Sequence, residues 1–413
     1  MIRLKSAVSS YLFILLILSS FTVKADTVVE LEKRIQQLEA LVEKLMSNTA
    51  NEASLGKEKH ESDDKANTSS LNDLTLEVEE QQYLIEELSK KDENQMQVSG
   101  YADVEYKGSD SPGASEEFRM HHLSLFFTKK FDNKFKFFSE IEYEDAPKFD
   151  GVNDGSGDLE EAAGTIFVEA VNFDWNYSQA FNIRAGRFFS PAGIWSEDHY
   201  PPFVATQERP MHIFRIFPQF VDGVSGYGRQ YLSDSISVDY NVFLGNGESS
   251  VSGKKDLNSN KATGFRGRIQ LPIWDEFSFG FTFYNDNEDS ANGNADKFAH
   301  GYHLEARYHN FSLQGEYAFA NLTFSDDSLD YDREGFYAQV KYHLNDWDIG
   351  YRYDFYDANS IGVNTIKRNS VFVNFHVNEA MTLKGEYHKN QYQDSLVDDV
   401  GFYTFSISTY LGN

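Results

Sequence analysis

The segment WDIGYRYDF, residues 347–355, alternates strictly between apolar and polar positions. Successive side chains of an extended strand point to opposite faces, so one face of this segment is apolar and the other is polar. The apolar face carries Trp347, Ile349, Tyr351, Tyr353 and Phe355. The polar face carries Asp348, Gly350, Arg352 and Asp354. This period of two predicts a β-strand that separates an apolar medium from a polar one.

Segments of this kind recur along the chain from residue 97 onward. We predict sixteen strands, near 97–106, 118–129, 135–145, 163–175, 180–188, 222–232, 236–244, 263–271, 277–285, 298–309, 311–320, 334–344, 347–356, 366–377, 381–390 and 400–411. Their connections alternate between short turns and longer loops rich in Gly, Asn, Ser and acidic residues. An even strand count, segments of about ten residues and this alternation are typical of transmembrane barrels. We therefore predict an all-β fold, a sixteen-stranded antiparallel transmembrane β-barrel over 97–413.

Composition agrees with a barrel wall between lipid and water. The chain has 413 residues, 15% of them aromatic, and a formal net charge of −28. Its acidity argues against nucleic acid as a partner, because nucleic-acid binding normally needs a basic face. The absence of cysteine excludes disulfides and thiolate metal sites. The strands of a soluble sandwich or β-helix would also alternate, but their apolar face would line the interior. In a transmembrane barrel the apolar face points outward, so outer-membrane lipid is its expected partner.

The amino-terminal region is predicted to contain a targeting signal followed by two helical segments. Residues 1–25 carry early positive charges, the apolar run YLFILLIL at 11–18 and a V-K-A cleavage site, which is typical of a secretory signal peptide. Heptad spacing predicts a short periplasmic α-helical coiled coil over 26–48 and a second helical segment over 70–92. Between them, 49–69 is a polar linker. A single amphipathic surface helix is the alternative for 26–48.

The connection 190–221 differs from the other long loops. It contains five of the eight prolines and several aromatic and aliphatic residues that need burial. A solvated outer loop does not supply this burial, so we expect the connection to fold into the lumen, against the inner barrel wall, and to narrow the pore. The alternative is a plug or cap over the mouth. Its charged residues are the candidate constriction residues, namely Glu197, Asp198, Glu208, Arg209 and Arg215.

A sixteen-stranded barrel is wide enough to hold an aqueous channel. Strand parity places seven basic residues on the wet face, and we expect them to line the lumen: Arg266, Arg268, Arg307, Lys341, Arg352, Arg368 and Lys384. Acidic residues are interspersed among them. Such charges need water around them, because a closed core would penalise each unpaired ion by several kcal/mol.

Several short motifs resemble the phosphate-selective porin O/P family of Gram-negative outer membranes. They are IRAGRF at 183–188, PAG at 191–193, ERP at 208–210 and GVSG at 223–226, and the resemblance covers most of 97–413. It implies a homotrimeric sixteen-stranded channel in the outer membrane, an amino-terminal coiled coil in the periplasm, and phosphate or anion selectivity. The chain departs from the family in having no lysine between Lys148 and Lys254. This departure favours a general or mildly selective channel.

We therefore expect a passive diffusion channel for small hydrophilic solutes or anions, with no catalytic residues, metal or cofactor. A structural or receptor-type outer-membrane barrel, or an adhesin, with acidic ligand-binding loops is the alternative. His121 and His122 are adjacent and are expected to face opposite sides of a strand. The acidic run 145–161 lacks the spacing of a calcium loop and is expected to be a solvated outer loop.

Overall fold

The computed structural model describes residues 95–145, 164–248, 259–290, 293–363 and 365–412. The predicted signal peptide, both helical segments and the polar linker lie outside these residues. Within the described ranges, no helix is long and apolar enough to cross a membrane.

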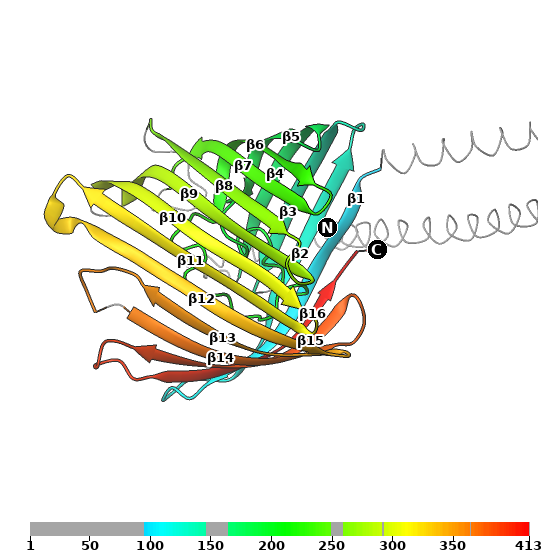
Figure 1. Cartoon of the computed structure of the whole chain (residues 1–413). Coiled ribbons are helices and arrows are strands. Elements are labelled where there is room, and N and C mark those ends of the chain that lie inside the picture. Colours follow the sequence, from blue (N-terminus) through cyan, green and yellow to red (C-terminus); the bar gives the residue numbers. More distant parts are fainter. Residues whose placement is uncertain (1–94, 146–163, 249–258, 291–292, 364, 413) are drawn as a thin grey trace, which may run out of the picture. The chain divides into compact units, whose positions relative to one another are not determined.

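The described residues form one closed antiparallel barrel of sixteen strands (Figure 1). In chain order the strands are β1 (Gln97–Ser109), β2 (Glu117–Lys130), β3 (Phe135–Glu144), β4 (Thr165–Ser178), β5 (Phe181–Phe189), β6 (Phe220–Ser233), β7 (Ile236–Asn246), β8 (Lys261–Leu271), β9 (Glu276–Ser290), β10 (Gly293–Tyr308), β11 (Phe311–Phe324), β12 (Tyr331–Leu344), β13 (Trp347–Asp357), β14 (Thr365–His376), β15 (Met381–Tyr392) and β16 (Val400–Tyr410). Each strand pairs with its chain neighbours, and β1 pairs with β16 to close the ring. The predicted barrel and strand count are confirmed.

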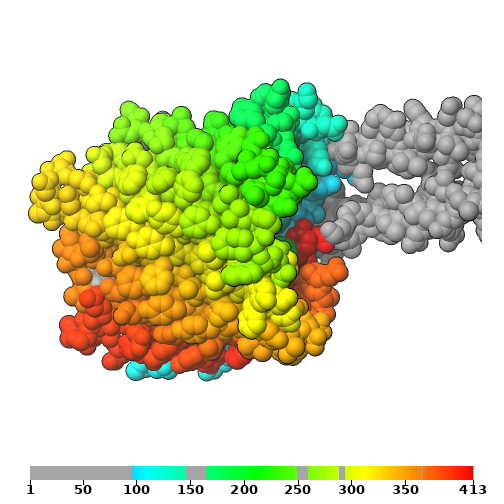
Figure 2. Space-filling model, in the orientation of Figure 1, coloured from blue at the N-terminus to red at the C-terminus, as the bar shows by residue number. Residues whose placement is uncertain are grey.

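Burial is inverted relative to a soluble protein, as β13 shows. Arg352 and Asp354 are fully buried inside the barrel, whereas Ile349 is 48% exposed and Tyr351 is 40% exposed on its outer surface. In the space-filling view, the side chains of β10 to β13 form a continuous outer wall (Figure 2). An apolar exterior around a charged interior suits a wall with lipid outside and polar groups inside.

The connections differ in length between the two ends of the barrel. Turns of two residues join β12 to β13 and β10 to β11, and 190–219 is the longest described connection. The prediction of a long loop after β9 is wrong, because β9 extends to Ser290 and β10 begins at Gly293. Residues 286–290 and 293–297 pair across these two strands, so their polar composition indicated a loop although their backbone continues the ladder. Trp274 and Trp347 lie exposed beside short turns, as expected of an aromatic girdle.

Two β-bulges lie on adjacent hairpins. Asp103 pairs with His122 and Val104 pairs with Met120, so His121 is the extra residue of β2. A second bulge makes Glu169 the extra residue of β4, opposite β3. The prediction that His121 and His122 face opposite sides is wrong, because the bulge turns both imidazole rings toward Asp103.

Candidate pore constriction

The connection between β5 and β6, residues 190–219, lies within the barrel and is called the inner loop. Its apolar side chains are buried; Trp195 is 2% exposed and Ile216 is fully buried. They pack toward β10, β11 and β12, where the inward positions include the small residues Ala299 and Ala318. Small side chains on the wall leave room for the loop. The apolar residues that made this connection unusual in sequence are therefore buried against the inner wall.

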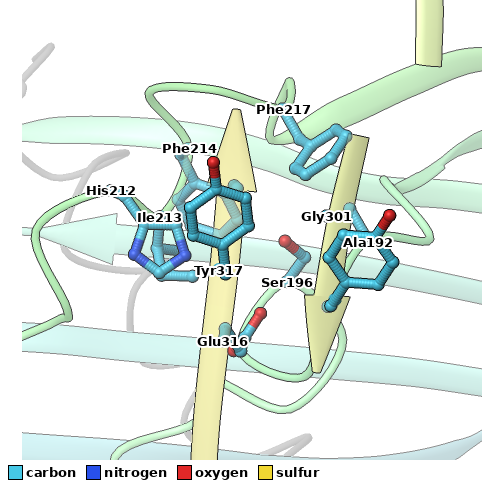
Figure 3. A pocket seen from close by; sticks show the side chains of 12 residues that line it. Ala192, Ser196, His212, Ile213, Phe214, Phe217, Gly301, Glu316 and Tyr317 are labelled. Atoms are coloured by element: carbon cyan, nitrogen blue, oxygen red, sulfur yellow. The ribbon is translucent and has the colours of Figure 1, made fainter. Parts of the chain in front are cut away.

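A tight contact fixes the start of the inner loop on β11. The backbone N–H of Trp195 donates to Glu316 at 3.0 Å, and the Tyr337 hydroxyl donates to the same carboxylate at 3.0 Å. Gly193 has a φ of +61°, and a Cβ there would lie 1.7 Å from a Glu316 oxygen. Ala192, Ser196, Phe217 and Glu316 line a small cavity (Figure 3). Its volume of about 10 Å³ holds roughly one water molecule.

The other side of the inner loop is held by polar side chains of β13 to β15. Arg352 donates to the Thr206 hydroxyl and, at 2.9 Å, to the Glu208 carbonyl. Lys384 donates to the carbonyls of Pro201 and Val204 at 2.5 and 2.7 Å. Buried cations thus satisfy the loop's backbone oxygens, which would otherwise be unpaired in a site shielded from water.

Glu208 is a central ion-pair partner within the loop. Its carboxylate lies 3.3 Å from the Lys107 amine and 3.2 Å from the Arg368 guanidinium. Although burial opposes the charged form, these cations lower the pKa of Glu208 to about 2. The carboxylate of Glu386 also accepts from the backbone N–H groups of Gln207 and Glu208. Side chains of β1, β14 and β15 therefore all contact the loop at Gln207 and Glu208.

The five predicted constriction residues contact different parts of the barrel and of the loop. Glu197 pairs with Arg266 at 2.9 Å, and Asp198 faces a cavity next to β8 to β12. Arg209 lies over the Phe214 ring, 4.7 Å from its centroid, and Arg215 lies over the Tyr356 ring at 5.1 Å. In the part of the chain that the structure describes, neither arginine has a carboxylate within ion-pair distance.

The seven basic residues predicted to line the lumen all lie on the inner face of the barrel. Arg266, Arg352, Arg368 and Lys384 contact the inner loop. Arg268, Arg307 and Lys341 line a cavity of about 290 Å³ between the loop and the wall of β8 to β12. Asp198, Glu276 and Glu305 also line this cavity, so its formal charges balance.

Sequence reasoning missed an acidic wall on β1 to β4. It is composed of Asp103, Glu105, Glu140, Glu142, Glu144 and Glu169, together with His121 and His122. Inward parity of β3 could have indicated Glu140, Glu142 and Glu144, whereas Glu169 and His121 depend on the bulges. Several of these side chains lie close enough together to hold a cation.

Two histidines of the inner loop are buried in neutral form. Burial is the main cause that lowers the pKa of His199 to about 3, and the positive charge of Arg209 is the second cause. Burial also lowers the pKa of His212 to about 4, and the nearby charges of Asp354 and Arg352 act in opposite directions. Neither His199 nor His212 has a hydrogen-bond partner for its Nδ1 atom within the described residues. Docking of the loop therefore favours their deprotonated forms.

Comparisons with known proteins add the following. No family model matches the chain. An uncharacterised protein of Aquifex aeolicus (strain VF5) is 27% identical over 353 residues, covering 73% of this chain and 77% of that protein. The anion-selective porin from Comamonas acidovorans is 13% identical and aligns with a TM-score of 0.55, covering 77% of this chain and 99% of that chain. The trimer form of OmpT from Vibrio cholerae is 12% identical, with a TM-score of 0.50 over 76% of this chain and 99% of that chain. The chain therefore has the fold of the outer-membrane porins.

Proposed function

We propose that the chain is a homotrimeric outer-membrane porin, a passive diffusion channel for small hydrophilic solutes. The observation that carries this proposal is the inner loop, which lies inside a closed barrel whose interior is charged and whose exterior is apolar. A lumen lined with charge requires water, and a barrel of this strand number has room for it. The proposed activity is conduction without a chemical step, so it assigns no catalytic residue.

The proposed solute path runs through the cavity beside the inner loop. Three cations and three carboxylates line it. Selectivity depends on the local ring of charge rather than on the net charge of the chain. A balanced lining supports weak discrimination by charge and discrimination mainly by size.

Liposome swelling tests this function directly. Liposomes that contain the purified protein are expected to swell in small sugars such as arabinose, and to swell more slowly as the sugar grows to a trisaccharide. Heat-denatured protein is the control. Swelling no faster than in this control would contradict the channel and favour the structural or receptor-type barrel.

Any anion preference would rest on Arg209 and Arg215, because their side chains are exposed and have no carboxylate partner among the described residues. Changing both to glutamate is expected to move the reversal potential in a KCl gradient toward cation preference. The physical reason is that fixed charge beside the path changes the local concentration of each ion. Single-channel recordings in planar bilayers measure this shift.

The matched control is Lys130→Glu with Lys134→Glu, which changes the net charge equally at the exposed end of β2 and in the turn that follows it. This control is expected to leave the reversal potential unchanged. An equal shift in both double variants, or no shift in either, would mean that Arg209 and Arg215 do not border the path.

A further inference from the structure

The acidic wall contains three side chains that converge on one point from β2 and β3. His122 Nε2 lies 3.5 Å from Glu144 Oε1 and 4.0 Å from Glu142 Oε1. The three ligand atoms lie within 4.8 Å of one another. Two ligands of one tetrahedral zinc ion, each bonded at about 2.0–2.2 Å, are roughly 3.3–3.6 Å apart. The separation of 3.5 Å from Glu144 falls in this range, and the separation of 4.0 Å from Glu142 lies above it.

In each of these side chains, the polar atom that faces away from the other two has a hydrogen-bond partner. His122 Nδ1 is 2.8 Å from Asp103 Oδ1, and the Thr165 hydroxyl donates to Glu144 Oε2 at 3.3 Å. The Tyr101 hydroxyl donates to Glu142 Oε2. A carboxylate on one imidazole nitrogen leaves the other nitrogen free to bind a metal, and such outer partners orient metal ligands in known sites. Here the partners leave Nε2 and two Oε1 atoms facing one another.

A further buried carboxylate, Glu169, lies beside this group and shares Glu142 with it. Glu169 is 3% exposed, and its Oε2 atom has no hydrogen-bond partner within the described residues. One of its oxygens lies within 4.8 Å of ligand atoms of Glu140 and Glu142. Glu169 is the bulged residue of β4, so a local irregularity of the strand turns it toward the group. Buried carboxylates this close to one another favour a bound cation or proton.

We propose that His122, Glu142 and Glu144 bind a divalent transition-metal cation, Zn²⁺ or Mn²⁺, on the lumen wall. One imidazole nitrogen with two carboxylate oxygens suits such ions, whereas Ca²⁺ and Mg²⁺ take oxygen ligands. Glu140 and Glu169 add negative charge beside the ion. Glu144 is 28% exposed in its side chain, so the site is accessible from the lumen. The three side chains occupy three coordination positions of the ion. A fourth position stays open for water or solute.

This inference goes beyond the proposed channel and does not depend on it, because binding can be measured without an open pore. Isothermal titration of the purified full-length protein in detergent, with ZnCl₂ and separately with MnCl₂, is the test. We expect one ion per chain for at least one of the metals. Glu142→Gln and His122→Gln are each expected to weaken binding at least tenfold. Glu305→Gln, which removes a lumen carboxylate on β10 away from the site, is expected to bind as the parent does.

Heat-modifiable migration in gel electrophoresis shows that each variant still forms the barrel. Mn²⁺ electron paramagnetic resonance provides a second readout, in which the free-ion signal falls when the ion is bound. Binding of neither metal by the folded parent would overturn the proposal. Equal affinity of the parent and the folded Glu142→Gln variant would overturn it as well, because the ion would then lie elsewhere.

Discussion

Arg352→Met is expected to destabilise the barrel by about 3–5 kcal/mol, because it breaks a fully buried ion pair and leaves Asp354 without its cation. The same change removes the hydrogen bonds from Arg352 to Thr206 and to the Glu208 carbonyl. The inner loop then loses a main anchor on β13. We expect a lower unfolding temperature and a noisier single-channel current, measured by circular dichroism and in planar bilayers.

Two comparisons separate this effect from a general loss of charge. Arg307→Met removes an exposed arginine paired with Glu276, and exposed pairs contribute only about 0–1 kcal/mol. The double variant Arg352→Met with Asp354→Asn is expected to recover part of the lost stability, since no buried charge remains unpaired. Equal unfolding temperatures for Arg352→Met and Arg307→Met would contradict the anchoring role.

Acidification from pH 7 to pH 4 is expected to loosen the inner loop. The folded-state pKa values of His199 and His212, about 3 and about 4, lie below the ordinary value of 6.5. The undocked loop therefore binds more protons than the docked loop between pH 6.5 and pH 4. Docking is fully favoured above pH 6.5 and loses about 1.4 kcal/mol per pH unit for each histidine as the pH falls. By pH 4 the loss is about 3 kcal/mol per histidine.

Charged side chains of both signs face these imidazoles. His199 lies 3.9 Å from Glu169 and also feels the charge of Arg209, and His212 lies near Asp354 and Arg352. We expect single-channel current at pH 4 to fluctuate between levels that are absent at pH 7. His199→Leu with His212→Leu is expected to remove most of this pH dependence.

The matched control is His300→Leu, whose ring packs with Phe298 and Tyr302 on the outer surface. It removes a histidine without touching the inner loop, so its pH response is expected to equal that of the parent. An unchanged current between pH 7 and pH 4 in the parent would contradict the docking of neutral histidines.

The strand pattern could be predicted from sequence because each strand separates two media. Residues 347–355 alternate so strictly that the buried face of β13, with Arg352 and Asp354, follows from parity alone. The inner loop was also predictable, because residues such as Trp195 and Ile216 need burial that an outer loop does not supply. Both inferences use local chemistry and need no knowledge of the pairing between strands.

Other features depend on contacts between distant parts of the chain. The turn after β9 was misplaced because residues 286–290 and 293–297 are mostly polar, and only pairing shows that they continue the ladder. The bulges at His121 and Glu169 are properties of two strands at once, so a parity rule applied to one strand cannot find them. The anchors from Lys384 to the loop carbonyls are invisible in sequence for the same reason.

The same limit explains why the contacts of the predicted constriction residues could not be predicted. Their positions within the loop were known, but their partners were not. Glu197 faces β8, Glu208 faces β1 and β14, and Arg215 faces β13. A loop that contacts many strands distributes its charges around the lumen, and local sequence carries no information about which strand each charge meets.

Conductance in a planar lipid bilayer tests the central claim, that the barrel holds a water-filled path beside the inner loop. Purified protein added to the bilayer is expected to raise the current in discrete events, each closing in three equal steps at high voltage, as a trimer of independent channels would. A bilayer that stays sealed, although the protein has inserted as a folded barrel, would contradict the account.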